Sequence, residues 1–170
     1  MRSQSYGRIV LTTSSSGLFG NFGQANYGAA KMALVGLMQT LAIEGERYGI
    51  RVNCLAPSAA TGMTEGLLPA ESLKLLDPAL VSPGMLALVG DAAPTRMILC
   101  AGAGHFASAT VDLSPGRFVG TGADAAERVV AELGAIADRD GAIVPDRGFI
   151  QVEREVESAS RAAADHDKAR

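Results

Sequence analysis

The sequence is poor in aromatic residues and in positive charge. It has no tryptophan, aromatic side chains make up 5% of its residues, and 15 Lys and Arg stand against 18 Asp and Glu, a net charge of -3. Binding to nucleic acid requires a basic stripe that faces the phosphates. This balance therefore excludes nucleic acid as a partner and leaves small molecules as the expected ligands.

Long hydrophobic runs are also missing. No apolar run reaches the length of about 20 residues that a membrane-spanning helix needs. Residues 1–5 lack the apolar stretch of a signal peptide. We therefore expect a cytoplasmic protein without a membrane partner.

Cysteine and histidine are scarce, with two of each. Cys54 and Cys100 each lie inside an apolar run typical of a strand, which predicts buried free thiols packed as small hydrophobic groups. A metal centre would need further ligands, and the widely spaced His105 and His166 do not supply them. We expect no metal site.

The apolar residues that are present predict an α/β fold. Residues 7–14 form a β-branched run that stops at serines and glycine, as a buried parallel strand does at its carboxyl end. Residues 25–48 predict a long helix with apolar positions around nearly its whole circumference, so we expect burial on more than one side. Residues 50–55 predict a second strand that Pro57 ends. The order predicts a right-handed βαβ crossover with parallel strands.

The rest of the chain predicts shorter elements. In order, we expect a Pro- and Gly-containing segment with short helical pieces, a third strand, an extended piece and an amphipathic helix, over residues 61–94, 96–101, 106–113 and 124–137. The last stretch is charged and Ala-rich without an apolar stripe. We therefore expect one structural unit over residues 1–150 and a polar, disordered tail over residues 151–170.

Three side chains suit proton transfer. Tyr27 and Lys31 lie four residues apart on one face of the expected helix, and a neighbouring ammonium favours the phenolate form of a tyrosine. Ser14 lies at the carboxyl end of the preceding strand, where open α/β sheets bind ligands, and can hydrogen-bond a substrate oxygen. The Tyr-Lys spacing alone is more often that of a solvated pair than of a catalytic one.

Four motifs occur in order on these elements. They are GRIV with SSSG, YGAAK, LAIE and IRVNCLAP, at residues 7–17, 27–31, 41–44 and 50–57. Together they closely resemble the second half of short-chain dehydrogenases/reductases. The segment GNFGQANY at residues 20–27 is most similar to the (3R)-hydroxyacyl-CoA dehydrogenase domain of peroxisomal multifunctional enzymes and their bacterial relatives.

This resemblance implies a role for each matching residue. Tyr27 would be the general acid/base, Lys31 would favour its phenolate and hold the nicotinamide ribose, and Ser14 would orient the carbonyl or hydroxyl. The cofactor contacts that it implies are Tyr27, Lys31, Pro57, Ser58, Ala60 and Thr64. One departure is visible, because the family usually has glycine where this chain has Ser58.

The implied activity is that of an NAD- or NADP-dependent oxidoreductase. Hydride would pass between the nicotinamide and a secondary alcohol or ketone, such as a 3-hydroxyacyl-CoA of lipid metabolism. The resemblance also implies a homo-oligomer, or pairing with another chain through the helix that carries Tyr27.

Parts of the family pattern have no counterpart here. The glycine-rich phosphate loop, the residue that selects NAD or NADP and the Asn-Asn-Ala-Gly motif would all precede residue 7. The implied fold is thus a partial Rossmann-type, three-layer αβα fold with a parallel sheet of about three strands, lacking the N-terminal βαβ units. Residues 120–125, GTGADA, fit the loose dinucleotide fingerprint but lack the strand that must precede it.

Three interpretations of the chain as a whole stay open. The first is a fragment or truncated gene model of an enzyme, inactive alone and weak in cofactor binding. The second is a non-catalytic subunit that pairs with a separate N-terminal half or with an intact relative, and the third is a non-functional remnant.

Overall fold

The computed structural model describes residues 1–62, 64, 66 and 68–168. The chain divides into two compact units, Met1–Thr110 and Val111–Arg170. The expected boundary after residue 150 is not the one at which the structure divides. Pairing in the four-stranded sheet reaches Ala109, next to the boundary of the first unit.

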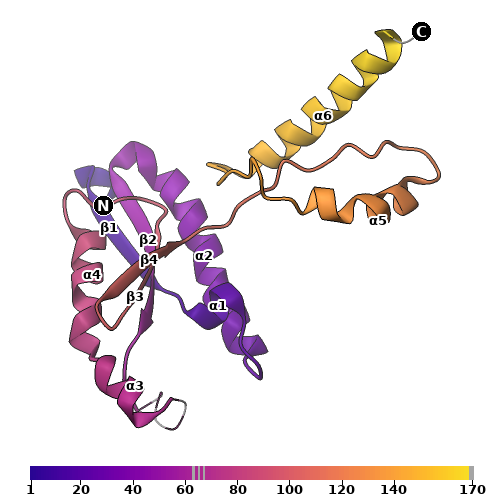
Figure 1. The fold of residues 1–170 in the computed structure, drawn as a ribbon. Coiled ribbons are helices and arrows are strands. Elements are labelled where there is room, and N and C mark those ends of the chain that lie inside the picture. The colour runs from indigo at the N-terminus through magenta and orange to yellow at the C-terminus, as the bar shows by residue number, and fades with distance from the viewer. Residues whose placement is uncertain (63, 65, 67, 169–170) are drawn as a thin grey trace. The chain divides into compact units, whose positions relative to one another are not determined.

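The first unit is built on a four-stranded sheet. Its strands are β1 (Gly7–Thr12), β2 (Ile50–Ser58), β3 (Ile98–Gly102) and β4 (His105–Ala109), in the order β1-β2-β3-β4 (Figure 1). β1, β2 and β3 are parallel, and β4 is antiparallel to β3. Ala103 and Gly104 connect the last two strands with positive φ angles of 52° and 72°, as a tight hairpin turn requires. The predicted α/β Rossmann-type fold is confirmed, with an antiparallel fourth strand added.

Helices cover both faces of this sheet. The α-helices are α1 (Ser15–Phe19), α2 (Ala25–Gly45), α3 (Ala70–Leu75) and α4 (Ser82–Val89). Short 3-10 turns are η1 (Arg2–Gln4), η2 (Glu46–Tyr48) and η3 (Pro78–Val81). α2 packs on one face of the sheet and α4 on the other, which gives the expected three layers (Figure 1).

The alternation of side chains along the strands produces two apolar clusters. The cluster on the α2 face contains Ile9, Leu11, Val35, Met38, Ala42, Val52, Cys54 and Ile98. The cluster on the α4 face contains Val10, Leu55, Met85, Leu88, Leu99 and Ala101. Neighbouring residues of each parallel strand thus lie in different clusters, as expected for a sheet buried on both faces.

The other side of α2 is open in the first unit. Met32, Leu37 and Ile43 are 38%, 46% and 46% exposed. The expectation that this helix is buried on more than one side is therefore wrong for the unit itself, because the sheet covers only the face that carries Val35 and Met38.

Pro57 does not end β2, contrary to expectation. Cys54 donates its backbone N–H to Met97 in the β3 direction, so alternation directs the nitrogens of Leu55 and Pro57 toward β1. Pairing with β1 ends at the pair Thr12 and Leu55. Since no β1 residue lies opposite Pro57, its missing N–H costs no ladder hydrogen bond, and β2 continues alongside β3.

The second unit contains two helices, α5 (Ala125–Ile136) and α6 (Phe149–Lys168), and an antiparallel bridge between Leu113 and Ile143. α6 replaces the disordered tail that we expected. Alanines favour the helix, Gln151 bonds Glu155, and Glu157 pairs with Arg161 four residues on. The partly buried positions recur every four residues, at Ile150, Arg154, Ser158 and Ala162.

Both cysteines are free, as expected. Cys54 is buried in β2, and burial raises the pKa of its thiol to about 11, while Cys100 is half-buried. No group of His, Cys, Asp and Glu in the described residues could hold a metal ion. Within the same residues, no helix has the length and apolar character to cross a membrane.

Asn53 supports the connection into β3, which yields a stability prediction. Its side chain is fully buried, donates to the Pro94 carbonyl at 2.8 Å and accepts from the Met97 N–H at 3.0 Å. Asn53→Leu should lower the free energy of unfolding by about 2–5 kcal/mol, because two buried backbone groups lose their partners. Urea unfolding measures this, with exposed Asn21→Ala as a control that should change it by less than about 0.5 kcal/mol. Equal effects of the two substitutions would contradict the role of Asn53.

Candidate active site

Ser14 lies directly after β1, at the carboxyl edge of the parallel strands. It is the N-cap residue of α1, and its Oγ accepts a hydrogen bond from the Ser16 N–H at 3.2 Å. The extended backbone of Ser14 turns the chain from the strand into the helix. The structure thus places this hydroxyl at the edge where open α/β sheets bind their ligands.

Tyr27 and Lys31 lie on the first two turns of α2 and are brought together. The Lys31 Nζ is 5.6 Å from the centroid of the Tyr27 ring. The same ammonium donates to the carbonyl oxygen of Thr12, the last residue of β1, at 2.9 Å. This bond holds the lysine at the carboxyl edge of the sheet, beside the tyrosine.

Close packing of α2 against the end of β1 fixes this pair. The buried Thr13 hydroxyl donates to the Lys31 carbonyl at 2.7 Å. Gly17 of α1 touches the same turn, because a Cβ there would lie 2.8 Å from the Lys31 Cβ and 2.9 Å from the Met32 nitrogen. Only glycine permits this approach. Sequence reasoning missed Thr12 and Thr13, although two polar residues ending an apolar strand before Ser14 are a usable signal.

The tyrosine itself faces solvent. Tyr27 is 44% exposed, and its backbone N–H donates to Asn26 Oδ1 at 2.8 Å. In the described part of the chain, no hydrogen bond joins the Tyr27 phenol to the Ser14 hydroxyl. The phenol is therefore accessible to a substrate that enters over the carboxyl edge.

The expected cofactor residues after β2 lie at the same edge of the sheet. Pro57 and Ser58 end β2, and Ser58 packs tightly against β3, since a Cβ on Gly102 would lie 2.9 Å from the Ser58 Cβ. The Ala60 N–H donates to Leu76 at 2.7 Å. These contacts fix the backbone of the loop beside the strand ends.

The Thr64 side chain forms hydrogen bonds within its own loop. Its Oγ1 accepts from the Thr61 N–H at 2.8 Å and lies 3.2 Å from the Ala59 carbonyl oxygen. The hydroxyl thus closes a short turn after β2.

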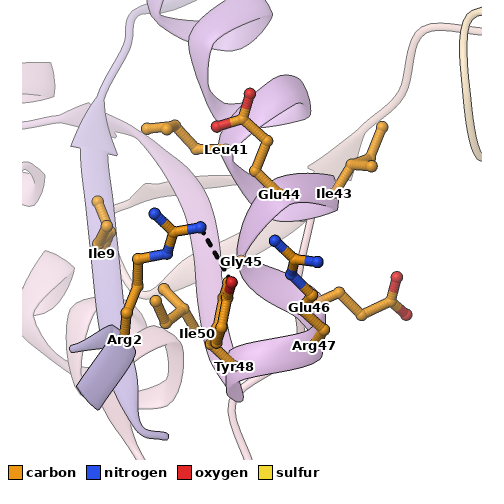
Figure 2. A pocket seen from close by; sticks show the side chains of 10 residues that line it. All are labelled: Arg2, Ile9, Leu41, Ile43, Glu44, Gly45, Glu46, Arg47, Tyr48 and Ile50. Carbon is orange, nitrogen blue, oxygen red and sulfur yellow. Dashed lines mark hydrogen bonds between the residues drawn. The ribbon is translucent and has the colours of Figure 1, made fainter. Parts of the chain in front are cut away.

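A large hollow of the first unit lies elsewhere. It has a volume of about 860 Å³ and is lined by Arg2, Ile9, Leu41, Ile43, Glu44, Gly45, Glu46, Arg47, Tyr48 and Ile50 (Figure 2). Arg2 donates to the Tyr48 hydroxyl across it at 3.0 Å. The hollow adjoins the last turn of α2 and the start of β2, whereas Tyr27 and Lys31 lie on the first turns of α2. Volume alone therefore does not mark the site, because ligands of open α/β sheets bind at the carboxyl edge.

Comparison with known proteins agrees with this geometry. Residues 1–71 match the family described as short chain dehydrogenase. The chain is 63% identical over 82 residues to a Mycobacterium tuberculosis protein named as a short-chain type dehydrogenase/reductase, covering 48% of this chain and 29% of that protein. It is 57% identical over 91 residues to the peroxisomal hydratase-dehydrogenase-epimerase of Saccharomyces cerevisiae, covering 54% of this chain and 10% of that protein.

A solved structure extends the similarity beyond the matched segment. The full-length peroxisomal multifunctional enzyme type 2 of Drosophila melanogaster has a TM-score of 0.79 and 30% identity, covering 94% of this chain and 29% of that one. The chain thus spans less than a third of each of these relatives. The matching segment contains Ser14, Tyr27, Lys31 and the strand pair β1 and β2. Residues 1–71 of this chain are therefore similar in sequence to short-chain dehydrogenases.

Proposed function

We propose that this chain carries the proton-transfer and nicotinamide-facing part of an NAD- or NADP-dependent oxidoreductase. The substrate is a secondary alcohol or ketone of the 3-hydroxyacyl thioester class. The observation that carries this proposal is the placement of the Lys31 ammonium beside the Tyr27 ring and on the end of β1. Support for the substrate class comes from two cyanobacterial relatives named 3-oxoacyl-[acyl-carrier-protein] reductase and acetoacetyl-CoA reductase.

The donors and acceptors of the site fit the nicotinamide end of such a cofactor. An ammonium has three donor hydrogens, and the Thr12 carbonyl accepts from Lys31. The other hydrogens of the Lys31 ammonium can be donated to ribose hydroxyls. Gly120 and the turn before α5 do not form the family's place for the pyrophosphate, since no strand directly precedes them.

The residues divide the chemistry among them. In reduction, the Tyr27 phenol donates its proton to the carbonyl oxygen of the substrate, and in oxidation the phenolate accepts it from the hydroxyl. The Lys31 ammonium stabilises that phenolate. Ser14 hydrogen-bonds the same substrate oxygen and fixes its position. The bound nicotinamide supplies or accepts the hydride.

A chimera tests the proposal directly. The segment of the mycobacterial relative that matches this chain over 82 residues is replaced by the corresponding residues of this chain. We expect reduction of acetoacetyl-CoA, measured by the loss of nicotinamide absorbance. A folded chimera that binds the cofactor and turns over no 3-oxoacyl thioester would contradict the proposal.

Substitutions of Lys31 and Ser14 in this chimera should distinguish effects on cofactor binding from effects on turnover. Lys31→Ala is expected to raise the dissociation constant of the cofactor and to slow turnover, because both the ribose contact and the phenolate partner are lost. Ser14→Ala should lower kcat by about tenfold or more and spare cofactor affinity. Titration and initial rates measure both, with exposed Lys74→Ala as the control. Lower cofactor affinity with unchanged turnover in Ser14→Ala would show that its role is misassigned.

A second candidate function is that of a pairing subunit. β1 is an edge strand of the sheet, and the open side of α2 carries Met32, Leu37 and Ile43. An edge strand and an apolar helix face both favour association with another polypeptide. In this case the partner is an intact relative, a separate N-terminal half or a second copy, joined through α2.

A further inference from the structure

A second hollow lies where α1 meets the first turns of α2. It has a volume of about 330 Å³ and is lined mainly by small residues, among them Gly17, Gly20, Ala25 and Gly28, together with Asn21 and Gln24. Its floor is rigid, because a Cβ on Gly28 would lie 3.0 Å from the Ser16 carbonyl oxygen. The hollow is therefore shaped by backbone rather than by side chains that could fill it.

Gln24, which lines this hollow, carries an unusual polar group. Its Oε1 is buried and has no hydrogen-bond partner, a condition that in the described residues it shares only with Arg128 Nε in the second unit. Gln24 precedes α2, yet its side chain does not cap the helix. A buried acceptor without a donor is unfavourable, so turning the amide toward a donor in the hollow would satisfy it.

The position of Gln24 couples it to the proposed chemistry. It lies three residues before Tyr27, and its carbonyl accepts from the Gly28 N–H at 2.7 Å. The side chain therefore originates at the same end of α2 as the phenol. A substrate that meets Tyr27 with its 3-oxo group can extend another part of itself toward Gln24.

The chemistry of the substrate class indicates which part of the substrate extends toward Gln24. A 3-oxoacyl thioester offers only acceptors at its reacting carbons, whereas the pantetheine-type arm beyond its sulfur carries amide N–H donors. We propose that Gln24 is a specificity-determining residue whose Oε1 accepts a hydrogen bond from an amide N–H of the thioester arm. This inference rests on the proposed function. It adds the side chain that would make the site prefer thioesters to other 3-oxo compounds.

Two probes that differ only in that donor test the inference. S-Acetoacetyl-N-acetylcysteamine carries one amide N–H, and its N-methylated counterpart carries none. Each is titrated into the full, ¹⁵N-labelled chain, and dissociation constants are taken from the NMR shifts. We expect the N–H probe to bind about five- to tenfold more tightly, the contribution of one neutral hydrogen bond. The side-chain amide signal of Gln24 should shift with that probe and not with the other.

Variants assign the preference to Gln24. Gln24→Met, which keeps the length and removes the acceptor, should abolish the difference between the probes. Gln24→Glu retains an acceptor and should keep it, as should the control Asn21→Ala on the wall of the same hollow. Equal binding of both probes by the wild-type chain, binding of neither, or an unchanged preference in Gln24→Met overturns the inference.

The test of Gln24 and the test of the proposed function can fail independently of each other. If Gln24→Met unfolds, the side-chain amide signal of Gln24 in the wild-type chain still decides, because it should shift with the N–H probe and not with the N-methylated one. Tyr27→Phe should remove turnover in the chimera and leave the probe preference of the chain intact. Persistent Tyr27-dependent turnover without any probe preference therefore sinks the assignment of Gln24 alone.

Discussion

Tyr27→Phe in the active chimera should lower kcat by at least about a hundredfold, the usual contribution of a general acid/base. The substitution removes only the hydroxyl that carries the transferable proton. The ring is 44% exposed, and the contact that holds Lys31 at the sheet edge runs to Thr12 rather than to the phenol. The fold and the cofactor affinity should therefore change little.

A second tyrosine of the same unit provides the matched control. The Tyr48 hydroxyl accepts from Arg2 at the carboxyl end of α2, at the opposite end of that helix from Tyr27. Tyr48→Phe removes the same atom type and should keep the wild-type rate. Initial rates with a 3-oxoacyl thioester, together with circular dichroism and cofactor titration, measure all three proteins. Retention of more than about a tenth of the rate by Tyr27→Phe would contradict the acid/base role.

The βαβ unit that holds the site is predictable from local patterns. The strand that ends shortly before Ser14 is an apolar run stopped by polar residues, and the spacing of Tyr27 and Lys31 lies inside an uninterrupted helical pattern. Strand, helix and strand connected closely in sequence leave essentially one parallel arrangement. Such features depend on neighbours in sequence, which is why they could be predicted.

Features that depend on distant partners could not be predicted. Pro57 continues β2 because β1 ends two pairs before the position that would oppose it, and that register is invisible in either segment alone. Lys31 is positioned by a backbone carbonyl of Thr12, an acceptor that every residue possesses. α6 is a miss of a different kind, because its stabilising pairs are local, such as Gln151 with Glu155 four residues on.

The 170-residue chain alone should bind NAD(H) and NADP(H) with dissociation constants of about 1 mM or weaker. Lys31, Tyr27 and the loop after β2 can contact the nicotinamide and its ribose. Most of the affinity for a dinucleotide comes from the pyrophosphate at a glycine-rich turn and helix N-terminus. The helix that directly follows β1 is α1, Ser15–Phe19, which is only five residues long.

The same chain should self-associate through surfaces that the first unit leaves open. β1 lies at one edge of the sheet, where its outward backbone groups can pair with another strand. Leu37 in the middle of the open side of α2 is 46% exposed, and Leu37→Glu should shift the chain toward monomer. Leu86→Glu on α4, at a position that is 68% exposed, is the matched control and should not.

Isothermal titration with each cofactor and light scattering on the purified chain measure both effects. Dilution of the wild-type chain should lower its apparent mass, and Leu37→Glu should remove that concentration dependence, because a charge cannot be buried in an apolar contact without a partner. Micromolar cofactor binding by a monomeric chain would overturn both expectations together. It would mean that these 170 residues complete a dinucleotide site at the carboxyl edge, with phosphate contacts supplied by residues other than those that face the nicotinamide.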